Sequence, residues 1–177
     1  MSEFLGILIK THAIRFLSCP AVHNSLIPKL LEMSDERCLV YDRKFACLVL
    51  DDILEFGLED REIDVSIRKS FIDRIVDGIL GGIRSFVRSE DAENTIGVTK
   101  DQEYKLLLAA THGCLVLMKQ HSDLIDISLK REIKEKLGIV IERFRLENKD
   151  KGEMGNGGDF EEAMLNALET IERIENS

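Results

Sequence analysis

The chain has 177 residues, of which 44% are hydrophobic and 32% are charged. This composition is that of an ordinary globular domain and excludes a disordered chain, because disordered segments are poor in hydrophobic residues. The formal net charge of −9, from 33 acidic and 24 basic residues, disfavours nucleic acids and anionic membranes as partners, since both are bound through basic residues.

The cysteines and the start of the chain predict an intracellular protein. No CxxC pair is present, and each cysteine lies among apolar residues, where it packs as a small hydrophobe: Cys19, Cys38, Cys47 and Cys114. The start, MSEFLGILIKTHAIRFL, lacks the basic region and the small-residue cleavage site of a secretory signal. We therefore expect reduced thiols and a cytoplasmic location, with the nucleus as an alternative.

The first half of the chain predicts four helices, because its apolar residues are spaced three and four apart. Pro20 ends the first helix, since the residue before a proline is forced out of the helical conformation. Pro28 is compatible only with the first turn of the second helix. The predicted helices cover residues 3–17, 22–33, 39–56 and 62–87, and the last contains an i, i+4 ladder of Ile63, Ile67, Phe71, Ile75, Ile79 and Ile83.

Three glycines inside this fourth helix, Gly78, Gly81 and Gly82, are unusual. Each costs about 1 kcal/mol relative to alanine in a helix interior, so a compensating role is expected. We favour the close approach of another helix, and a kink or a break into two helices is the alternative. The surface around these glycines is a candidate partner-binding site.

A central helix is predicted at residues 104–120, after an exposed loop at 89–98 and a capping-box pattern of Thr99 and Gln102. Its residues 106–118, LLLAATHGCLVLM, are apolar or small on every face, which is typical of a helix that is buried on all sides. At about 20 Å, this stretch is too short to span a bilayer.

His112 lies within the central helix and is predicted to be a buried core histidine, with Cys114 as a core filler. A small-ligand or enzymatic pocket at His112 and Cys114, joined by His12, His23 or a carboxylate, stays open as an alternative. The sequence contains no GxSxG, HExxH, P-loop or GxGxxG motif. We therefore expect no catalytic residues, no cofactor and no metal.

Asp51 and Glu55, one helical turn apart, are predicted to form a solvated acidic face. A metal site built from paired carboxylates in a helical bundle would need a Glu-x-x-His partner on another helix. The sequence contains no such motif.

The end of the chain predicts a domain of residues 1–148, a flexible Gly-rich linker at 149–158 and an amphipathic helix at 159–177. Before the linker, Ser128 is predicted to cap a helix that reaches residue 147. The terminal helix is either the last core helix or an arm that docks on another copy or on a partner. Its narrow apolar stripe, with steps of four and three, consists of Phe160, Met164, Ala167, Ile171 and Ile174.

Residues 43–57, RKFACLVLDDILEFG, followed by the long helix at 63–87, are similar to one helical hairpin of an importin-β-like HEAT array. Residues 103–147 supply a second hairpin of similar layout. This resemblance to HEAT and armadillo-type repeat proteins implies stacked antiparallel helices and a protein-binding scaffold. It carries no catalytic residues over to this chain.

A wholly apolar central helix among amphipathic helices also resembles the layout of Bcl-2-like bundles. The Asn-Trp-Gly-Arg motif of the cellular members is absent, and the chain has no Trp. This second resemblance implies a groove that binds an amphipathic helix of a partner.

Together these features predict an all-α fold, an irregular array or bundle of about six or seven helices. The function expected of it is non-enzymatic, namely a protein–protein interaction or assembly module. Its expected partner is another protein or a larger complex, and the terminal helix is a means of homo-oligomerisation.

Overall fold

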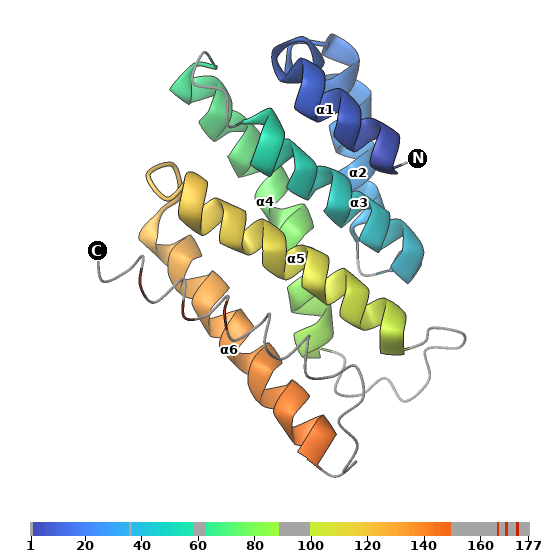
Figure 1. Ribbon diagram of the computed structural model, residues 1–177, viewed down its shortest axis with the longest axis vertical. Coiled ribbons are helices and arrows are strands. Elements are labelled where there is room, and N and C mark those ends of the chain that lie inside the picture. Colours follow the sequence, from blue (N-terminus) through green and yellow to red (C-terminus); the bar gives the residue numbers. More distant parts are fainter. Residues whose placement is uncertain are drawn as a thin grey trace.

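The computed structural model describes residues 2–35, 37–58, 63–88 and 100–149, together with Asn166, Glu169 and Arg173. Within these residues the protein is all-α, as predicted (Figure 1). The elements in chain order are α1 (Ser2–Leu17), the π-helical turn η1 (Val22–Leu26), α2 (Ile27–Met33), α3 (Val40–Asp52), the π-helical turn η2 (Ile53–Gly57), α4 (Val65–Arg88), α5 (Lys100–Gln120) and α6 (Ile127–Lys149).

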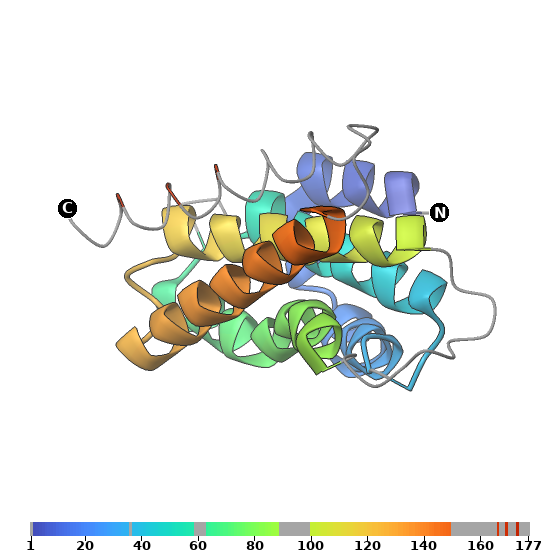
Figure 2. The same ribbon diagram turned by 90° about the horizontal axis from the view of Figure 1, so that it is seen from below.

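These helices form successive antiparallel hairpins that stack in two layers. α1, α3 and α5 lie side by side in one layer and run in the same direction (Figures 1 and 2). α2, α4 and α6 run the opposite way, and α4 contacts both α2 and α6 in the second layer. α1 therefore lies at one end of its layer, with α3 as its neighbour there.

The core lies where α3, α4 and α5 meet. The ladder of α4 is buried from Phe71 onward, whereas Ile67 near the start of the helix is 48% exposed. Each fully buried large apolar side chain contributes about 1.5–3 kcal/mol to folding. The largest of them on α3, η2 and α4 are Leu50, Ile53, Leu54, Phe71, Ile72, Ile75, Ile79 and Leu80.

α5 is buried on three sides rather than on all sides, so the expectation of a fully enclosed helix is wrong. Ala110, Cys114 and Leu117 are fully buried between α3 and α4, but Leu108 is 42% exposed and His112 is exposed as well. The open face lies opposite the one on which Ala110 packs against Gly82 of α4, that is, on the outer side of the layer.

The second and third predicted helices each contain a π-helical turn that the periodicity did not reveal. Pro28 lies in the first turn of α2, as predicted. Gly57 is the last residue of η2, and Leu58 donates its backbone N–H to the Ile53 carbonyl oxygen over 3.0 Å. α1 also departs from regular geometry, at His12, where φ is −140° and ψ is 38°.

The start of α6 also differs from the prediction. Asp126, not Ser128, is the residue that caps this helix: its Oδ1 accepts hydrogen bonds from the backbone N–H of Leu129 at 2.8 Å and from the Ser128 hydroxyl at 2.6 Å. Both residue types are good helix caps, so the sequence alone did not distinguish them.

Several predictions lie outside the described residues. They are the loop at 89–98, Thr99 of the capping box, most of the linker at 149–158 and most of the terminal helix at 159–177. Asn166, Glu169 and Arg173 of that helix are described, and all three are helical and exposed.

Among the described helices, none is both long and apolar enough by itself to cross a membrane. By length and composition alone, the bent pair Phe4–Leu17 and Val22–Met33, whose axes meet at 108°, passes the same test together.

Candidate functional site

A cleft of about 390 Å³ opens between the C-terminal end of α2 and the middle of α4. Two of the three predicted glycines, Gly78 and Gly81, lie in its wall. The other lining residues are mainly polar, so the cleft is suited to hydrogen bonds and ion pairs rather than to an apolar ligand. The described residues that line it are Leu31, Ser34, Asp35, Arg74, Asp77, Gly78, Gly81 and Arg84.

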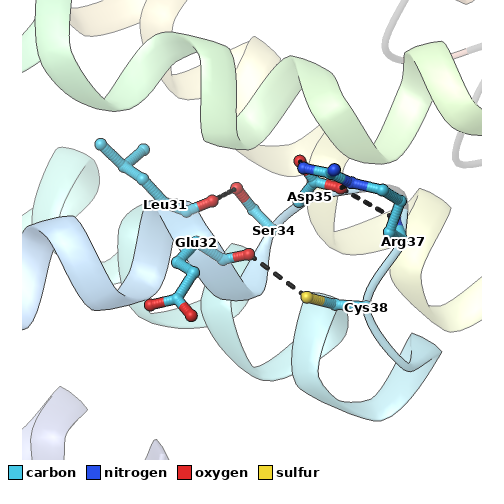
Figure 3. A network of polar contacts seen from close by, with 6 residues as sticks. All are labelled: Leu31, Glu32, Ser34, Asp35, Arg37 and Cys38. Carbon is cyan, nitrogen blue, oxygen red and sulfur yellow. Dashed lines mark hydrogen bonds and ion pairs between the residues drawn. The ribbon is translucent and has the colours of Figure 1, made fainter.

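One side of the cleft is the turn after α2, which side chains hold in place (Figure 3). Ser34 ends the helix and donates its hydroxyl to the Leu31 carbonyl oxygen at 2.8 Å. Asp35 accepts hydrogen bonds from the Arg37 backbone N–H and from its guanidinium, at 2.8–2.9 Å. The Arg37 guanidinium holds the pKa of Asp35 well below its usual value, so this carboxylate is charged at neutral pH.

The other side of the cleft is α4, where glycines allow the turn and neighbouring helices to approach closely. A Cβ atom at Gly78 would lie 2.6 Å from Leu50 Cδ1 of α3 and 3.0 Å from Leu31 Cδ2 of α2. A Cβ atom at Gly81 would lie 3.3 Å from the Ser34 carbonyl oxygen. α4 is continuous from Val65 to Arg88, so the close-approach interpretation is confirmed and the break is not.

Gly82 does not reach the cleft. It faces α5, where an added Cβ atom would lie 3.0 Å from the Cβ atom of Ala110. Of the three predicted glycines, Gly78 and Gly81 therefore share a site, and Gly82 serves the α4–α5 contact.

Two arginines of α4 supply the positive charge of the cleft, and both are held in place. Arg84 forms ion pairs with Asp77 at 2.9 Å and with Glu132 of α6 at 2.8 Å. Arg74 donates to the backbone carbonyl oxygen of His23 at 2.9 Å. The cleft therefore presents fixed positive and negative groups side by side, an arrangement that matches a charged, polar segment of polypeptide.

His112 is not the buried core histidine that the sequence predicts. Its side chain is 48% exposed, and Nδ1 donates to Asp51 Oδ2 of α3 at 2.7 Å. This hydrogen bond raises the pKa of His112, against the opposing effect of burial. Asp51 in turn is buried rather than solvated as predicted, because α5 packs directly over this part of α3.

The buried histidine of the described chain is instead His121, at the end of α5. It is 1% exposed, and its Nε2 lies 3.0 Å from the Leu54 carbonyl oxygen. Burial lowers its pKa. The sequence signal for this buried histidine is its position directly after the apolar helix α5. There its ring nitrogen can form a hydrogen bond with a backbone carbonyl group of η2.

Cys114 fills the core as predicted, and Cys47 of α3 does the same. Burial raises the pKa of both thiols, so neither is a reactive thiolate. His12 is exposed on α1, and His23 lies beside Phe71 and Arg74. Among the described residues, no three histidine, cysteine or acidic side chains are grouped as metal ligands.

The predicted partner-binding residues of the terminal helix, Phe160, Met164, Ala167, Ile171 and Ile174, lie outside the described residues. The cleft between α2 and α4 is thus the candidate site that the structure builds from predicted residues. Comparison of the chain with protein-family models, with curated proteins and with solved structures gives no match.

Proposed function

We propose that the protein is a non-enzymatic interaction module, a helical scaffold in the manner of HEAT and armadillo arrays. Its antiparallel hairpins, stacked in two layers, support this proposal. A protein of this design offers extended surfaces between neighbouring helices to a partner.

The observation that carries the proposal is the cleft between α2 and α4. Gly81 allows the backbone of the turn to approach α4, and Gly78 makes room for the side chains of Leu31 and Leu50, each at a cost in helix propensity. The charged groups around the two glycines are already oriented. A preorganised, mixed-charge cleft binds a segment of protein with a smaller entropic cost than a flexible surface does. The partner that fits is an extended or looped segment bearing both acidic and basic side chains.

Affinity purification of the full chain from cell extract, followed by mass spectrometry, tests this function. The variant Gly81→Leu places a side chain in the cleft, and Gly138→Leu is its matched control on α6, where an added Cβ atom meets nothing within 4 Å. We expect the wild type and Gly138→Leu to recover a stoichiometric protein partner. With Gly81→Leu, the amount of recovered partner should fall to about one tenth or less.

A second variant tests the same cleft in case Gly81→Leu does not fold. Asp77→Lys reverses a charge at the rim of the cleft, where the side chain is 75% exposed and Arg84 keeps Glu132 as a partner. It should weaken the complex without lowering Tm. A chain that is purified alone yet binds a metabolite or a metal would contradict the proposed function.

The Asp51–His112 pair favours a second candidate function, an enzymatic or small-ligand site. A carboxylate on Nδ1 fixes the ring and leaves Nε2 directed away from it, which is the orientation of a general base. If this candidate holds, a small molecule will raise the Tm of the wild type and not that of His112→Gln. A thermal-shift screen of metabolites distinguishes it from protein binding.

A Bcl-2-like groove receives less support. A central helix in such a bundle is enclosed by its neighbours, whereas α5 leaves Leu108 and His112 open to solvent.

A further inference from the structure

The two arginines that line the cleft between α2 and α4 differ in their partners. Arg84 is held by two carboxylates, those of Asp77 at 2.9 Å and Glu132 at 2.8 Å. Arg74 donates from Nη2 to the His23 carbonyl oxygen at 2.9 Å, and its Nη1 lies 3.5 Å from His23 Nδ1. Among the residues that the structure describes, Arg74 therefore has neutral partners and no carboxylate, whereas the charge of Arg84 is matched twice.

The other carboxylates around Arg74 are engaged by other cations. Asp73, the preceding residue of α4, pairs with Lys69 at 3.1 Å. Asp35, on the opposite wall of the cleft, accepts two hydrogen bonds from the Arg37 guanidinium (Figure 3). Arginine has five N–H donors and pairs with a carboxylate through two parallel hydrogen bonds. The half-buried Arg74 is thus a fixed cation that still lacks its counter-charge.

The cleft is therefore polarised along α4. Arg74 provides an excess positive charge at one end, and at the other end two carboxylates, Asp77 and Glu132, surround the one guanidinium of Arg84. The Arg84 side chain reaches back toward Asp77, so the centres of the two ends lie about 10–15 Å apart along the helix. About three to five residues of extended chain span this distance.

We infer, on the basis of the proposed protein-binding function of this cleft, that the bound segment places a carboxylate side chain on Arg74. A basic side chain of the same segment, about three to five residues away, lies against Asp77 and Glu132. Arg74 then sets the specificity, because a carboxylate supplies the counter-charge that this guanidinium lacks and an amide does not. The His23 carbonyl holds the guanidinium in place before the segment arrives, which lowers the entropic cost of binding.

Selection of short random peptides, displayed on phage, against the full chain tests this specificity. The peptides that bind in the cleft are those that Gly81→Leu, with a side chain in the cleft, no longer binds. Asp77→Lys takes the place of this variant if Gly81→Leu does not fold. We expect the cleft-binding peptides to share an acidic residue and, about three to five residues away in either direction, a basic residue.

A double-mutant cycle on one synthetic cleft-binding peptide isolates the contact with Arg74. Arg74→Gln, or replacement of the acidic residue of the peptide by its amide, should each weaken binding about tenfold or more. Both changes together should cost no more than either alone. Arg74→Lys should retain part of the affinity, because lysine keeps the charge but lacks the planar arrangement of donors. Arg131→Gln, the same change at an exposed position of α6, is the control and should bind as the wild type does.

The possible outcomes distinguish the role of Arg74 from the proposed function. If Arg74 only supports η1, Arg74→Gln will weaken the acidic peptide and its amide equally. That result, or cleft-binding peptides that share no acidic residue, would overturn the role of Arg74 and leave protein binding by the cleft intact. If no selected peptide is lost in the cleft variants, both proposals are contradicted. Thermal unfolding of each variant checks that it is folded.

Discussion

At the scale of residues, His112 has an environment opposite to the one expected from the sequence. His112 lies in the most apolar stretch of the chain and yet is exposed, while His121, beyond that stretch, is buried. Composition predicts that a helix is buried but not which of its faces lacks a neighbour. That face is decided by the order of helices in the layers, which local periodicity does not contain.

The His112–Asp51 pair predicts a loss of stability with rising pH. Because its folded pKa is raised above 6.5, the contribution of His112 is complete below that pH and is lost as the pH rises through the folded value. The free energy of unfolding, measured in urea between pH 6 and 8, should fall less steeply for His112→Gln than for the wild type. Equal slopes for the two proteins would contradict this prediction.

His121 predicts the opposite dependence. Burial lowers its folded pKa below 6.5, so the unfolded chain binds a proton first and stability rises with pH until about 6.5. His121→Ala should lose about 2–4 kcal/mol at pH 7, because it removes the hydrogen bond to Leu54 and leaves a cavity. Chemical denaturation at pH 5 and 7 should also show a smaller pH effect in this variant. A loss below 0.5 kcal/mol would show that the site is looser than the contacts indicate.

At the scale of elements, the α4 glycines show how packing overrides intrinsic preference. An alanine at Gly78 gains helix propensity, worth about 1 kcal/mol, but its Cβ atom meets the buried Leu50 side chain at 2.6 Å. Overpacking costs about 1–3 kcal/mol, so we expect a net loss for Gly78→Ala. Gly138→Ala, with open space around it, should instead gain up to about 1 kcal/mol. Thermal unfolding of the two variants compares them directly, and a stabilised Gly78→Ala would show that α3 and α4 can separate easily.

The existence and order of the elements could be predicted, because apolar spacing reports helices directly. Their ends and interruptions could not. The π-helical turns η1 and η2 insert a residue into otherwise regular patterns, and Asp126 and Ser128 compete as caps two residues apart. Of the candidate site, Gly78 and Gly81 were predicted from their cost to the helix. Asp35, Arg74 and Arg84 were not predicted, since the sequence pattern of a solvent-facing charged residue does not indicate whether that residue lines a cleft.

At the scale of the whole molecule, the described helices share one hydrophobic core. The described core residues all lie within residues 9–141. We therefore expect a chain that lacks residues 152–177 to fold, with a Tm within a few degrees of the wild type at concentrations at which both are monomeric. Calorimetry measures this difference. A large loss of Tm would place the terminal helix in the core of its own chain.

Cys47 and Cys114 are buried on the facing helices α3 and α5, so the labelling of their thiols reports the separation of these two helices. Both thiols are at most 1% exposed, whereas Cys19 is exposed. With a thiol-specific reagent under native conditions, Cys19 should be labelled at once. Cys47 and Cys114 should be labelled together, at the rate at which α3 and α5 separate. Their labelling kinetics, read by mass spectrometry, would measure how often the centre of the array opens without any denaturant or engineered probe.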